Sequence, residues 1–283
     1  MSAKKIAVIT DSLSAGFYFS KWHSYYGEQF GNNSLYVVTY SGLKNQFRDL
    51  DLGGVFEVPH LYNDEKRSIM IAGFVKTLLC IYDYVIRVDA DEFIIPDPRK
   101  YGSLAEYAEQ LTRPYVTSIG YDVVQSAEEP DLDFDRNILV DQRKNAFCLT
   151  ALNKTCITSI PLEWTPGFHF CSVYPSHDDL YLLHMKRADI ASQIKWNQYM
   201  AGNMADDDSI RKHYDVESER VREFHDGVFK WPKAEGWEAF VSDEFNRQFF
   251  SGIKYIPGDK MYWGEFVLNP KIVSIPDEFS GIL

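Results

Sequence analysis

Residues 82–97 read Tyr-Asp-Tyr-Val-Ile-Arg-Val-Asp-Ala-Asp-Glu-Phe-Ile-Ile-Pro-Asp, a short apolar run that leads directly into a cluster of carboxylates. Residues 84–88 are rich in β-branched side chains and have the length of a buried strand in a parallel or mixed sheet. Asp89, Asp91 and Glu92 follow at once. Carboxylates at the end of a buried strand repel one another and lose hydration, so a fold retains them there only beside a cation or strong hydrogen-bond donors.

The spacing of these carboxylates indicates a metal site. In an extended segment Asp89 and Asp91 point to one side and Glu92 to the other. Two oxygen ligands on one side can hold a divalent ion and leave positions open for a diphosphate. An acidic pair in a surface turn is the alternative, but apolar residues on both sides of the motif argue against it. Glu92 is expected to accept hydrogen bonds that hold the motif in shape.

The composition is that of a globular protein with a sizeable core, since 45% of the 283 residues are hydrophobic. The chain carries 29 basic and 41 acidic residues, a net charge of −12, which argues against extended nucleic-acid binding. An anionic ligand would need a metal or local donors to overcome this field.

The cysteines and the N-terminus predict a cytoplasmic location. The four cysteines show no CxxC pairing, so they are expected to be buried free thiols, as in a reducing compartment. No apolar segment has the length of a signal peptide or a membrane span. Peripheral membrane contact stays open. The cysteines are Cys80, Cys148, Cys156 and Cys171.

Strands and helices are predicted to alternate in the first part of the chain. This alternation indicates an α/β fold with a mixed, mainly parallel sheet flanked by helices, and ligands at the carboxyl ends of its strands. No GxGxxG or GxxxxGK[ST] pattern supports a dinucleotide fold or a P-loop. The predicted strands are residues 6–9, 35–39, 55–58 and 84–88, and the predicted helices are residues 14–26 and 64–79.

The second part of the chain is predicted to continue the domain and then to change character. Residues 147–152 and 155–160 are expected to form a hairpin around Asn153-Lys154. Beyond residue 200 the pattern weakens into a helical and aromatic stretch. We therefore predict a catalytic domain over residues 1–200 and a C-terminal extension over residues 201–283 that packs on it.

His184 and Lys186 end a predicted apolar strand far from the acidic motif. A histidine together with carboxylate oxygens suits Mn²⁺ better than Mg²⁺, so His184 is a candidate third ligand beside Asp89 and Asp91. Lys186 could neutralise a diphosphate. A buried histidine bonded to the backbone is the alternative for His184.

These motifs resemble those of a known enzyme family. Residues 82–97, with a helix on either side, are similar to the DxD region of bacterial family 2-like glycosyltransferases with a GT-A fold. His184 and Lys186 resemble the metal histidine and the phosphate lysine of such enzymes. The resemblance covers roughly residues 6–199.

The resemblance implies a Rossmann-like GT-A domain that transfers a sugar to a glycan or lipid-linked acceptor in polysaccharide biosynthesis. A UDP- or GDP-sugar would bridge to the protein through Mn²⁺ or Mg²⁺, with Asp91 as the firmer ligand and Asp89 nearer the ribose or sugar. An exposed helix charge is the alternative role for Arg67. The usual acidic residue of the second strand is not evident. The residues implied in donor binding are Thr10, Asp11, Tyr40, Ser41, Arg67, Asp89 and Lys186.

An inverting enzyme of this kind would need a carboxylate that deprotonates the acceptor hydroxyl. Glu163 is the first candidate, because the neighbouring Trp164 could raise its pKa and stack on a sugar. Asp178 or Asp179 is the second. The Glu-Asp pair of many inverting GT-A enzymes is missing, so a retaining mechanism stays open. His169 could belong to the acceptor site or coordinate nothing.

Two other classes of protein remain open from the sequence. A nucleotidyltransferase also places carboxylates after a strand and would activate a sugar phosphate with release of pyrophosphate, but the chain lacks a Gly-rich N-terminal phosphate loop. A non-catalytic carbohydrate-binding protein would use its aromatic residues for sugar, and the acidic motif would only order a loop.

Overall fold

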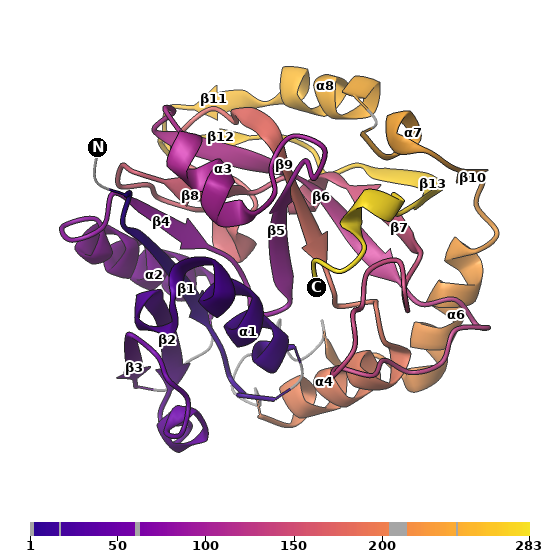
Figure 1. Ribbon diagram of the computed structural model, residues 1–283, viewed down its shortest axis with the longest axis horizontal. Coiled ribbons are helices and arrows are strands. Elements are labelled where there is room, and N and C mark those ends of the chain that lie inside the picture. Colours follow the sequence, from indigo (N-terminus) through magenta and orange to yellow (C-terminus); the bar gives the residue numbers. More distant parts are fainter. Residues whose placement is uncertain (1–2, 17, 60–62, 204–213, 242) are drawn as a thin grey trace.

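A computed structural model describes residues 3–16, 18–59, 63–203, 214–241 and 243–283. Within these ranges, 11 strands form one mixed sheet that runs through the molecule, with helices around it (Figure 1). The main path of the sheet is β10-β13-β7-β6-β8-β4-β1-β2-β3, and β9 pairs with both β5 and β6. The α/β fold with a mixed sheet predicted from the sequence is confirmed.

The N-terminal part of the sheet is parallel. Its strands are β1 (Ile6–Asp11), β2 (Leu35–Tyr40), β3 (Gly54–Val58) and β4 (Tyr84–Arg87), in the order β3-β2-β1-β4. Successive residues of a strand face opposite sides. Ile6 and Val8 therefore pack with α1 (Phe19–Phe30), whereas Ala7 and Ile9 pack with α2 (Asp64–Leu78).

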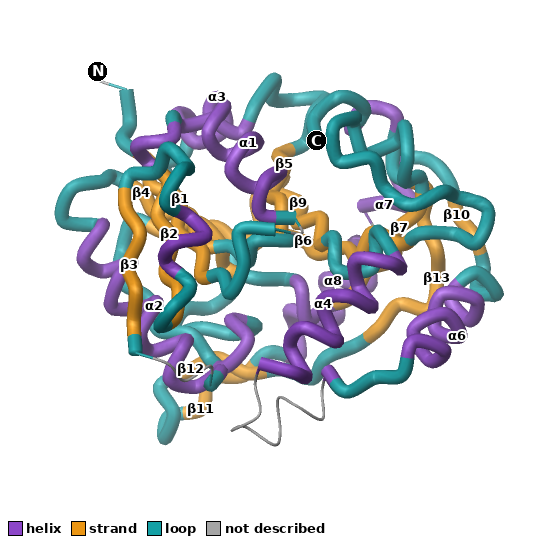
Figure 2. The backbone as a smooth tube through the Cα atoms, turned by 90° about the horizontal axis from the view of Figure 1, so that it is seen from below, coloured by secondary structure: helices purple, strands orange, loops and turns teal. Residues whose placement is uncertain are grey.

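Helices cover both sides of these strands. Helices α1 (Phe19–Phe30) and α3 (Leu104–Gln110) lie on one side and α2 (Asp64–Leu78) on the other (Figure 2). Helix α3 begins after the capping residue Ser103, whose hydroxyl accepts the Glu106 N–H at 3.0 Å. The core therefore has two apolar layers, and the strand ends between them carry the polar side chains described below.

Strand β5 (Glu92–Pro96), which begins with the last acid of the motif, pairs antiparallel with β9 (His177–His184). Two tyrosines of α1 contact the backbone of β5. The Tyr25 hydroxyl donates to the Ile94 carbonyl at 2.8 Å, and the Tyr26 hydroxyl donates to the Glu92 carbonyl and accepts the Ile94 N–H, both at 3.0 Å. Helix α1 is thereby tied to the strand that carries Glu92.

The hairpin predicted around Asn153-Lys154 is wrong. Strand β6 (Tyr115–Val124) lies between β7 (Asn145–Leu149) and β8 (Thr155–Thr158) and pairs antiparallel with both. The segment that connects β7 to β8, residues 150–154, crosses β6 at Gly120, where a Cβ would lie 2.1 Å from the Leu152 Cβ. The Asn153 side chain accepts the Gly120 N–H at 2.8 Å.

Residues beyond 200 add strands to the same sheet, because β13 (Leu268–Ser274) pairs with β7 and β10 (Lys233–Ala234) pairs with β13. Residues 204–213 of the predicted extension lie outside the described part of the chain. Strands β11 (Lys254–Ile256) and β12 (Met261–Trp263) form a separate two-stranded sheet. The remaining α-helices among the described residues are α4 (Ile190–Asn203), α6 (Ser218–Val228), α7 (Trp237–Val241) and α8 (Asp243–Gly252).

All four cysteines are free thiols, as predicted, but Cys80 is exposed and only the other three are buried. Cys80 follows the end of α2, where the chain turns at the surface towards β4. No helix in the described ranges combines the length and the apolar character needed to cross a bilayer.

Candidate active site

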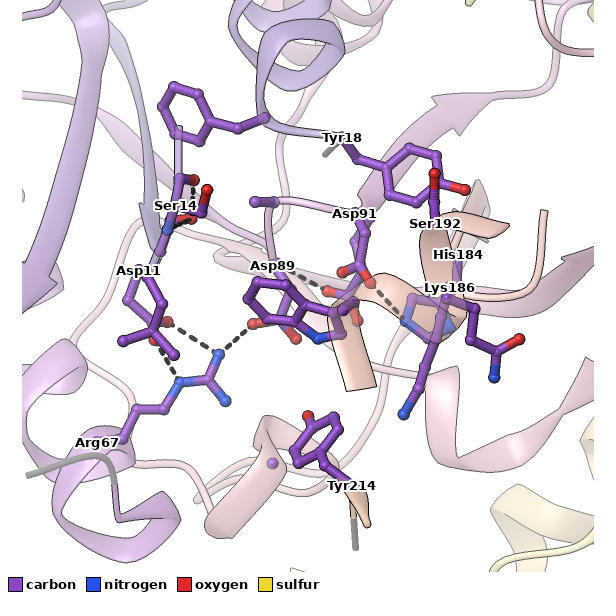
Figure 3. Close-up of a pocket in the computed structure, with 18 of the residues that line it drawn as sticks. Asp11, Ser14, Tyr18, Arg67, Asp89, Asp91, His184, Lys186, Ser192 and Tyr214 are labelled. Atoms are coloured by element: carbon purple, nitrogen blue, oxygen red, sulfur yellow. Dashed lines mark hydrogen bonds and ion pairs between the residues drawn. The ribbon is translucent and has the colours of Figure 1, made fainter. Parts of the chain in front are cut away.

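A cavity of about 480 Å³ lies where β1, β4 and β9 end (Figure 3). The acidic motif, the end of β9 and the start of α2 all contribute side chains to it. Because parallel strands end on the same edge of a sheet, residues far apart in the sequence meet here. The charged residues and histidines that line it are Asp11, Asp64, Arg67, Asp89, Asp91, Glu92, Lys154, His169, His184 and Lys186.

Asp91 and His184 face each other across this cavity, with 3.4 Å between Asp91 Oδ2 and His184 Nε2. The other ring nitrogen, Nδ1, lies 2.5 Å from Oδ1 of Asp122, which is His184's cross-strand neighbour on β6. Burial alone would lower the pKa of His184, but Asp122 and Asp91 outweigh it and raise this pKa to about 10. The imidazole is therefore held between two carboxylates.

Asp122 is the buried member of this trio. Its other oxygen accepts a hydrogen bond from Arg187 Nε at 3.1 Å. Burial favours the neutral carboxyl, but His184 and Arg187 lower its pKa to about 2. A carboxylate behind an imidazole fixes the ring's orientation and tautomer, as it does for metal-binding histidines.

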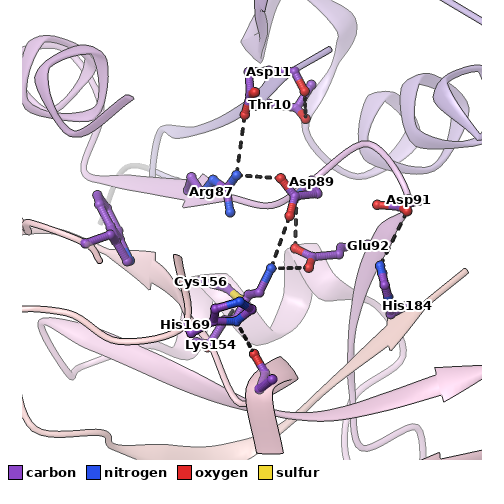
Figure 4. A network of polar contacts seen from close by, with 12 residues as sticks. Thr10, Asp11, Arg87, Asp89, Asp91, Glu92, Lys154, Cys156, His169 and His184 are labelled. Carbon is purple, nitrogen blue, oxygen red and sulfur yellow. Dashed lines mark hydrogen bonds and ion pairs between the residues drawn. The ribbon is translucent and has the colours of Figure 1, made fainter. Parts of the chain in front are cut away.

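Asp89 is surrounded by cations (Figure 4). Arg87 donates to its Oδ1 at 2.5 Å, Arg67 donates to the same oxygen, and Lys154 donates to Oδ2 at 3.1 Å. Burial opposes ionisation, but these three cations hold the pKa of Asp89 well below its usual range. Both oxygens are engaged in ion pairs, so a metal ion at Asp89 would compete with these three cations.

Glu92 accepts hydrogen bonds that hold the motif in shape, as predicted. The expectation that it points to the side opposite Asp89 and Asp91 is wrong, because the motif turns at residues 90 and 91 and all three carboxylates line the cavity. One carboxylate oxygen of Glu92 accepts the Asp89 N–H at 2.9 Å, and the other accepts from Lys154 at 2.5 Å. The residue is fully buried, and Lys154 is 5% exposed. Burial would lower the pKa of Lys154, but Glu92 and Asp89 raise it.

Arg67 is buried, so the alternative of an exposed helix charge is wrong. Its Nε lies 2.5 Å from Asp11 Oδ2 and its Nη2 lies 2.9 Å from Asp11 Oδ1. The same guanidinium reaches Asp89. Arg67 therefore links the end of β1 to the acidic motif, at the wall of the cavity where a donor nucleotide is expected.

Lys186 also lines the cavity. Within the described ranges no carboxylate lies within salt-bridge distance of its ammonium group, which is 5.1 Å from the centre of the Tyr214 ring. Burial and the neighbouring Arg187 lower the pKa of Lys186. A partly buried lysine in this setting is a suitable contact for an anionic ligand.

The other residues expected around the nucleotide lie behind the cavity wall or outside it. Thr10 is buried, and its hydroxyl contacts the Asp11 carbonyl at 3.4 Å. The hydroxyl of buried Tyr40 lies 3.5 Å from Asp11 Oδ2. Ser41 is exposed, and its hydroxyl donates to the Val58 carbonyl at 3.3 Å. Of these four residues at the ends of β1 and β2, only Asp11 lines the cavity.

The expected catalytic carboxylates lie away from the cavity. Glu163 is exposed, and its backbone N–H donates to the Ser172 hydroxyl at 3.1 Å. Asp178 and Asp179 lie at the start of β9, opposite to its His184 end, and pair with Arg113 at 3.3 Å and Lys100 at 2.8 Å. None of the three lines the cavity.

Three charged residues of this site were not singled out from the sequence, namely Arg87, Asp122 and Lys154. Arg87 and Asp122 interrupt apolar runs of strands that are buried along their length, and this interruption was the available signal. The sequence places Lys154 in a predicted hairpin turn, which gives no indication of its contacts with Asp89 and Glu92.

The donor set fits a metal site only in part. Among the described residues, no three His, Cys, Asp or Glu side chains gather closely enough to hold a metal ion. Asp91 and His184 form a two-ligand set, with a backing carboxylate on the imidazole. Such a pair binds a divalent ion when ligand phosphates and water complete the coordination.

Comparison with known proteins identifies no family. No family model matches the chain, and no curated protein matches its sequence. Solved structures similar to it include mannose-1-phosphate geranyltransferase from Thermus thermophilus, with 8% identity, a TM-score of 0.32, and coverage of 78% of this chain and 68% of that chain.

Two further structures show comparable likeness. S. aureus TarS 1-349 has 12% identity, a TM-score of 0.28, and coverage of 77% of this chain and 68% of that chain. The inositol-1-phosphate CTP transferase from T. maritima has 10% identity, a TM-score of 0.28, and coverage of 65% of this chain and 71% of that chain. Likenesses at this level do not establish an activity.

Proposed function

We propose that the chain is a metal-dependent glycosyltransferase, which moves a sugar from a UDP- or GDP-sugar to a hydroxyl of an acceptor. The observation that carries this proposal is the pair Asp91 and His184, 3.4 Å apart in a cavity that the cationic side chains of Arg67, Lys154 and Lys186 also line. A paired carboxylate and imidazole beside cations suits a metal-bridged diphosphate.

In this proposal Asp91 and His184, with its Nε2 deprotonated, would hold the divalent ion, and Asp122 fixes the orientation of the imidazole. A set that includes a nitrogen ligand favours Mn²⁺ over Mg²⁺. When bound, the ion offsets the negative charge that develops on the departing nucleoside diphosphate. Diphosphate oxygens and water would have to supply the other ligands.

The protein's own cations complete the phosphate contacts. Lys186 approaches the diphosphate from the end of β9, and Arg67 approaches it from α2. Asp89 holds Arg67 in place through its ion pair. The nucleoside then lies near Asp11 at the end of β1. The sequence resemblance supports a glycan or lipid-linked acceptor and a role in polysaccharide assembly.

The test is binding of UDP, GDP, CMP and dTDP and their hexose conjugates, measured by thermal shift with and without Mn²⁺. A ligand at roughly 100 times its Kd stabilises the native state by about 2.7 kcal/mol, a rise in Tm of roughly 5–11 °C. We expect this rise to need Mn²⁺ and to disappear in Asp91→Asn. Asp179→Asn, at the other end of β9, is the matched control that retains it.

Equal binding without metal by the wild type and by Asp91→Asn would refute the proposal. Pyrophosphate release from a nucleoside triphosphate and a sugar phosphate would instead establish the nucleotidyltransferase alternative. Glycan binding with no nucleotide affinity would establish a carbohydrate-binding protein.

A further inference from the structure

His169 lines the cavity, and one of its ring nitrogens forms a hydrogen bond with the backbone. It follows the turn Pro166–Phe168, and its Nδ1 lies 2.6 Å from the Ala151 carbonyl oxygen. A carbonyl oxygen can only accept, so Nδ1 carries a proton. In the neutral ring Nε2 then carries the lone pair and can accept a proton.

The surroundings of Nε2 keep it free to act. Among the described residues no hydrogen-bond partner contacts it. Gly167 adopts a φ of +72°, and a Cβ there would lie 2.5 Å from Nε2. Glycine at this position therefore permits the turn and also leaves the proton-accepting edge of the ring uncovered.

The charges that face His169 keep it neutral near pH 7. Burial is the largest cause, and Lys154 and Arg87 add to it, while the Ala151 carbonyl and Asp89 act in the opposite direction. The balance lowers the pKa of His169 to about 4. A neutral imidazole is the form required of a proton acceptor.

The carboxylates that line the cavity are already engaged in ion pairs. Asp11 and Asp64 pair with Arg67, Asp89 with three cations, Asp91 with His184, and Glu92 with Lys154. Glu163 and Asp178 lie outside it. Among the described ionisable residues that line the cavity, His169 is a base that makes no ion pair.

An aromatic surface leads from His169 to the outside. The Phe266 ring, 50% exposed, meets the His169 imidazole edge-on with 4.9 Å between centroids. Phe266 and the exposed Trp263 both pack on Phe170, with distances between ring centroids of 5.2 and 5.7 Å, respectively. Exposed aromatic rings with a polar group at one end suit a ligand with apolar faces and hydroxyls, such as a saccharide.

We infer that His169 is the general base of the transfer reaction and that the Trp263 and Phe266 surface receives a saccharide acceptor. This inference rests on the proposed function, because it assigns the acceptor side of the same cavity. The acceptor oxygen attacks the anomeric carbon as its proton passes to Nε2. The bond from that carbon to the phosphate oxygen breaks, and the nucleoside diphosphate leaves with the electron pair. The imidazolium then returns the proton to water.

His169→Asn tests the assignment. The Asn amide nitrogen can replace Nδ1 as the donor to Ala151, but the variant has no proton acceptor at the Nε2 position. His23→Asn is the matched control, because His23 bonds the Asp51 carbonyl at 2.7 Å outside the cavity. The assay measures nucleoside diphosphate release from the UDP- and GDP-hexoses, with water and with methyl hexopyranosides as acceptors.

We expect His169→Asn to lower kcat by roughly 10²–10⁴-fold, and to leave the Kd for UDP or GDP within about threefold. The wild-type rate should fall on the acid side of its pH profile, as the base becomes protonated, and this limb should vanish in the variant. His23→Asn should match the wild type.

The outcomes separate the two proposals. If His169→Asn keeps kcat within about tenfold and retains the acid limb, His169 has only a structural role and the inference is overturned. If the wild type neither binds a nucleoside diphosphate nor releases one from any nucleotide sugar tested, the proposed function itself fails, and the inference fails with it.

Discussion

Replacing Lys154 with methionine should destabilise the protein strongly, although it removes a single side chain near the surface of a cavity. Lys154 Nζ lies 2.5 Å from Glu92 and 3.1 Å from Asp89, and Glu92 is fully buried. Methionine retains most of the side-chain volume but leaves the Glu92 carboxylate without its cation. Loss of one partner from a buried ion pair costs about 3–5 kcal/mol, so we expect Tm to fall by roughly 6–20 °C.

The chain offers a matched control for this change. Lys100 lies 2.8 Å from Asp179, but its side chain is 49% exposed. An exposed pair contributes about 0–1 kcal/mol, so Lys100→Met should be nearly neutral. Thermal and denaturant unfolding at pH 7 measure both variants. If the two substitutions cost the same within about 1 kcal/mol, the reasoning from burial is wrong.

A double-mutant cycle separates the loss of the ion pair between Lys154 and Glu92 from the loss of side-chain packing. Glu92→Gln retains an oxygen that can accept the Asp89 N–H but removes the charge that Lys154 balances. The double variant Lys154→Met with Glu92→Gln should therefore cost less than the two single changes together. A difference of about 0.5–3 kcal/mol is the range typical of residues in one network. Strict additivity would contradict the ion-pair interpretation.

Three further outcomes follow from the contacts described above. The pKa of Asp122 in the folded protein, about 2, lies below the ordinary value of 3.8. Its ion pairs therefore contribute stability above about pH 4, and this stability is lost as the pH falls towards 2. In denaturant titrations across that pH range, Asp122→Asn should reduce the acid-induced loss by about 2 kcal/mol. Gly120→Ala should lower stability by at least about 1–3 kcal/mol, because the new Cβ would lie 2.1 Å from the Leu152 Cβ. In the native protein, Cys80 alone should react rapidly with a thiol reagent, and the three buried cysteines should react only on unfolding.

Local sequence signals predicted the strands and helices well where one apolar pattern decided the outcome. The β-branched run before Asp89 forms β4, and the apolar face of residues 64–79 forms α2 almost over its predicted length. The same patterns predicted that Asp89, Asp91, His184 and Lys186 would follow strands, and the structure brings all four to one cavity.

Local sequence signals do not predict which strands pair when the strands lie far apart in the chain. Asn153-Lys154 has the composition of a tight turn, and two apolar runs flank it, so local reasoning favours a hairpin. The insertion of β6 between β7 and β8 depends on contacts with a strand that lies upstream in the chain, for which Gly120 provides the necessary clearance. With the sheet order unknown, Lys154 and Asp122 could not be placed beside the motif.

The carboxylates expected to act as the base illustrate the same limit. Glu163 and Trp164 are adjacent in sequence, which suggested a shared pocket, but Trp164 turns inwards and its indole N–H donates to the Thr155 carbonyl. Glu163 turns outwards to solvent. Strand alternation explains the difference, because neighbouring residues of an extended segment face opposite sides.

The two tyrosines of α1 that bond the backbone of β5 have a consequence for solubility. A strand edge with bare N–H and C=O groups is a template on which another chain can add a strand. Tyr25 and Tyr26 occupy the Ile94 N–H and C=O groups and the Glu92 carbonyl, at the strand that begins with the last acid of the motif. A helix thereby shields this strand from intermolecular pairing, and the side chains of the acidic motif stay directed into the cavity.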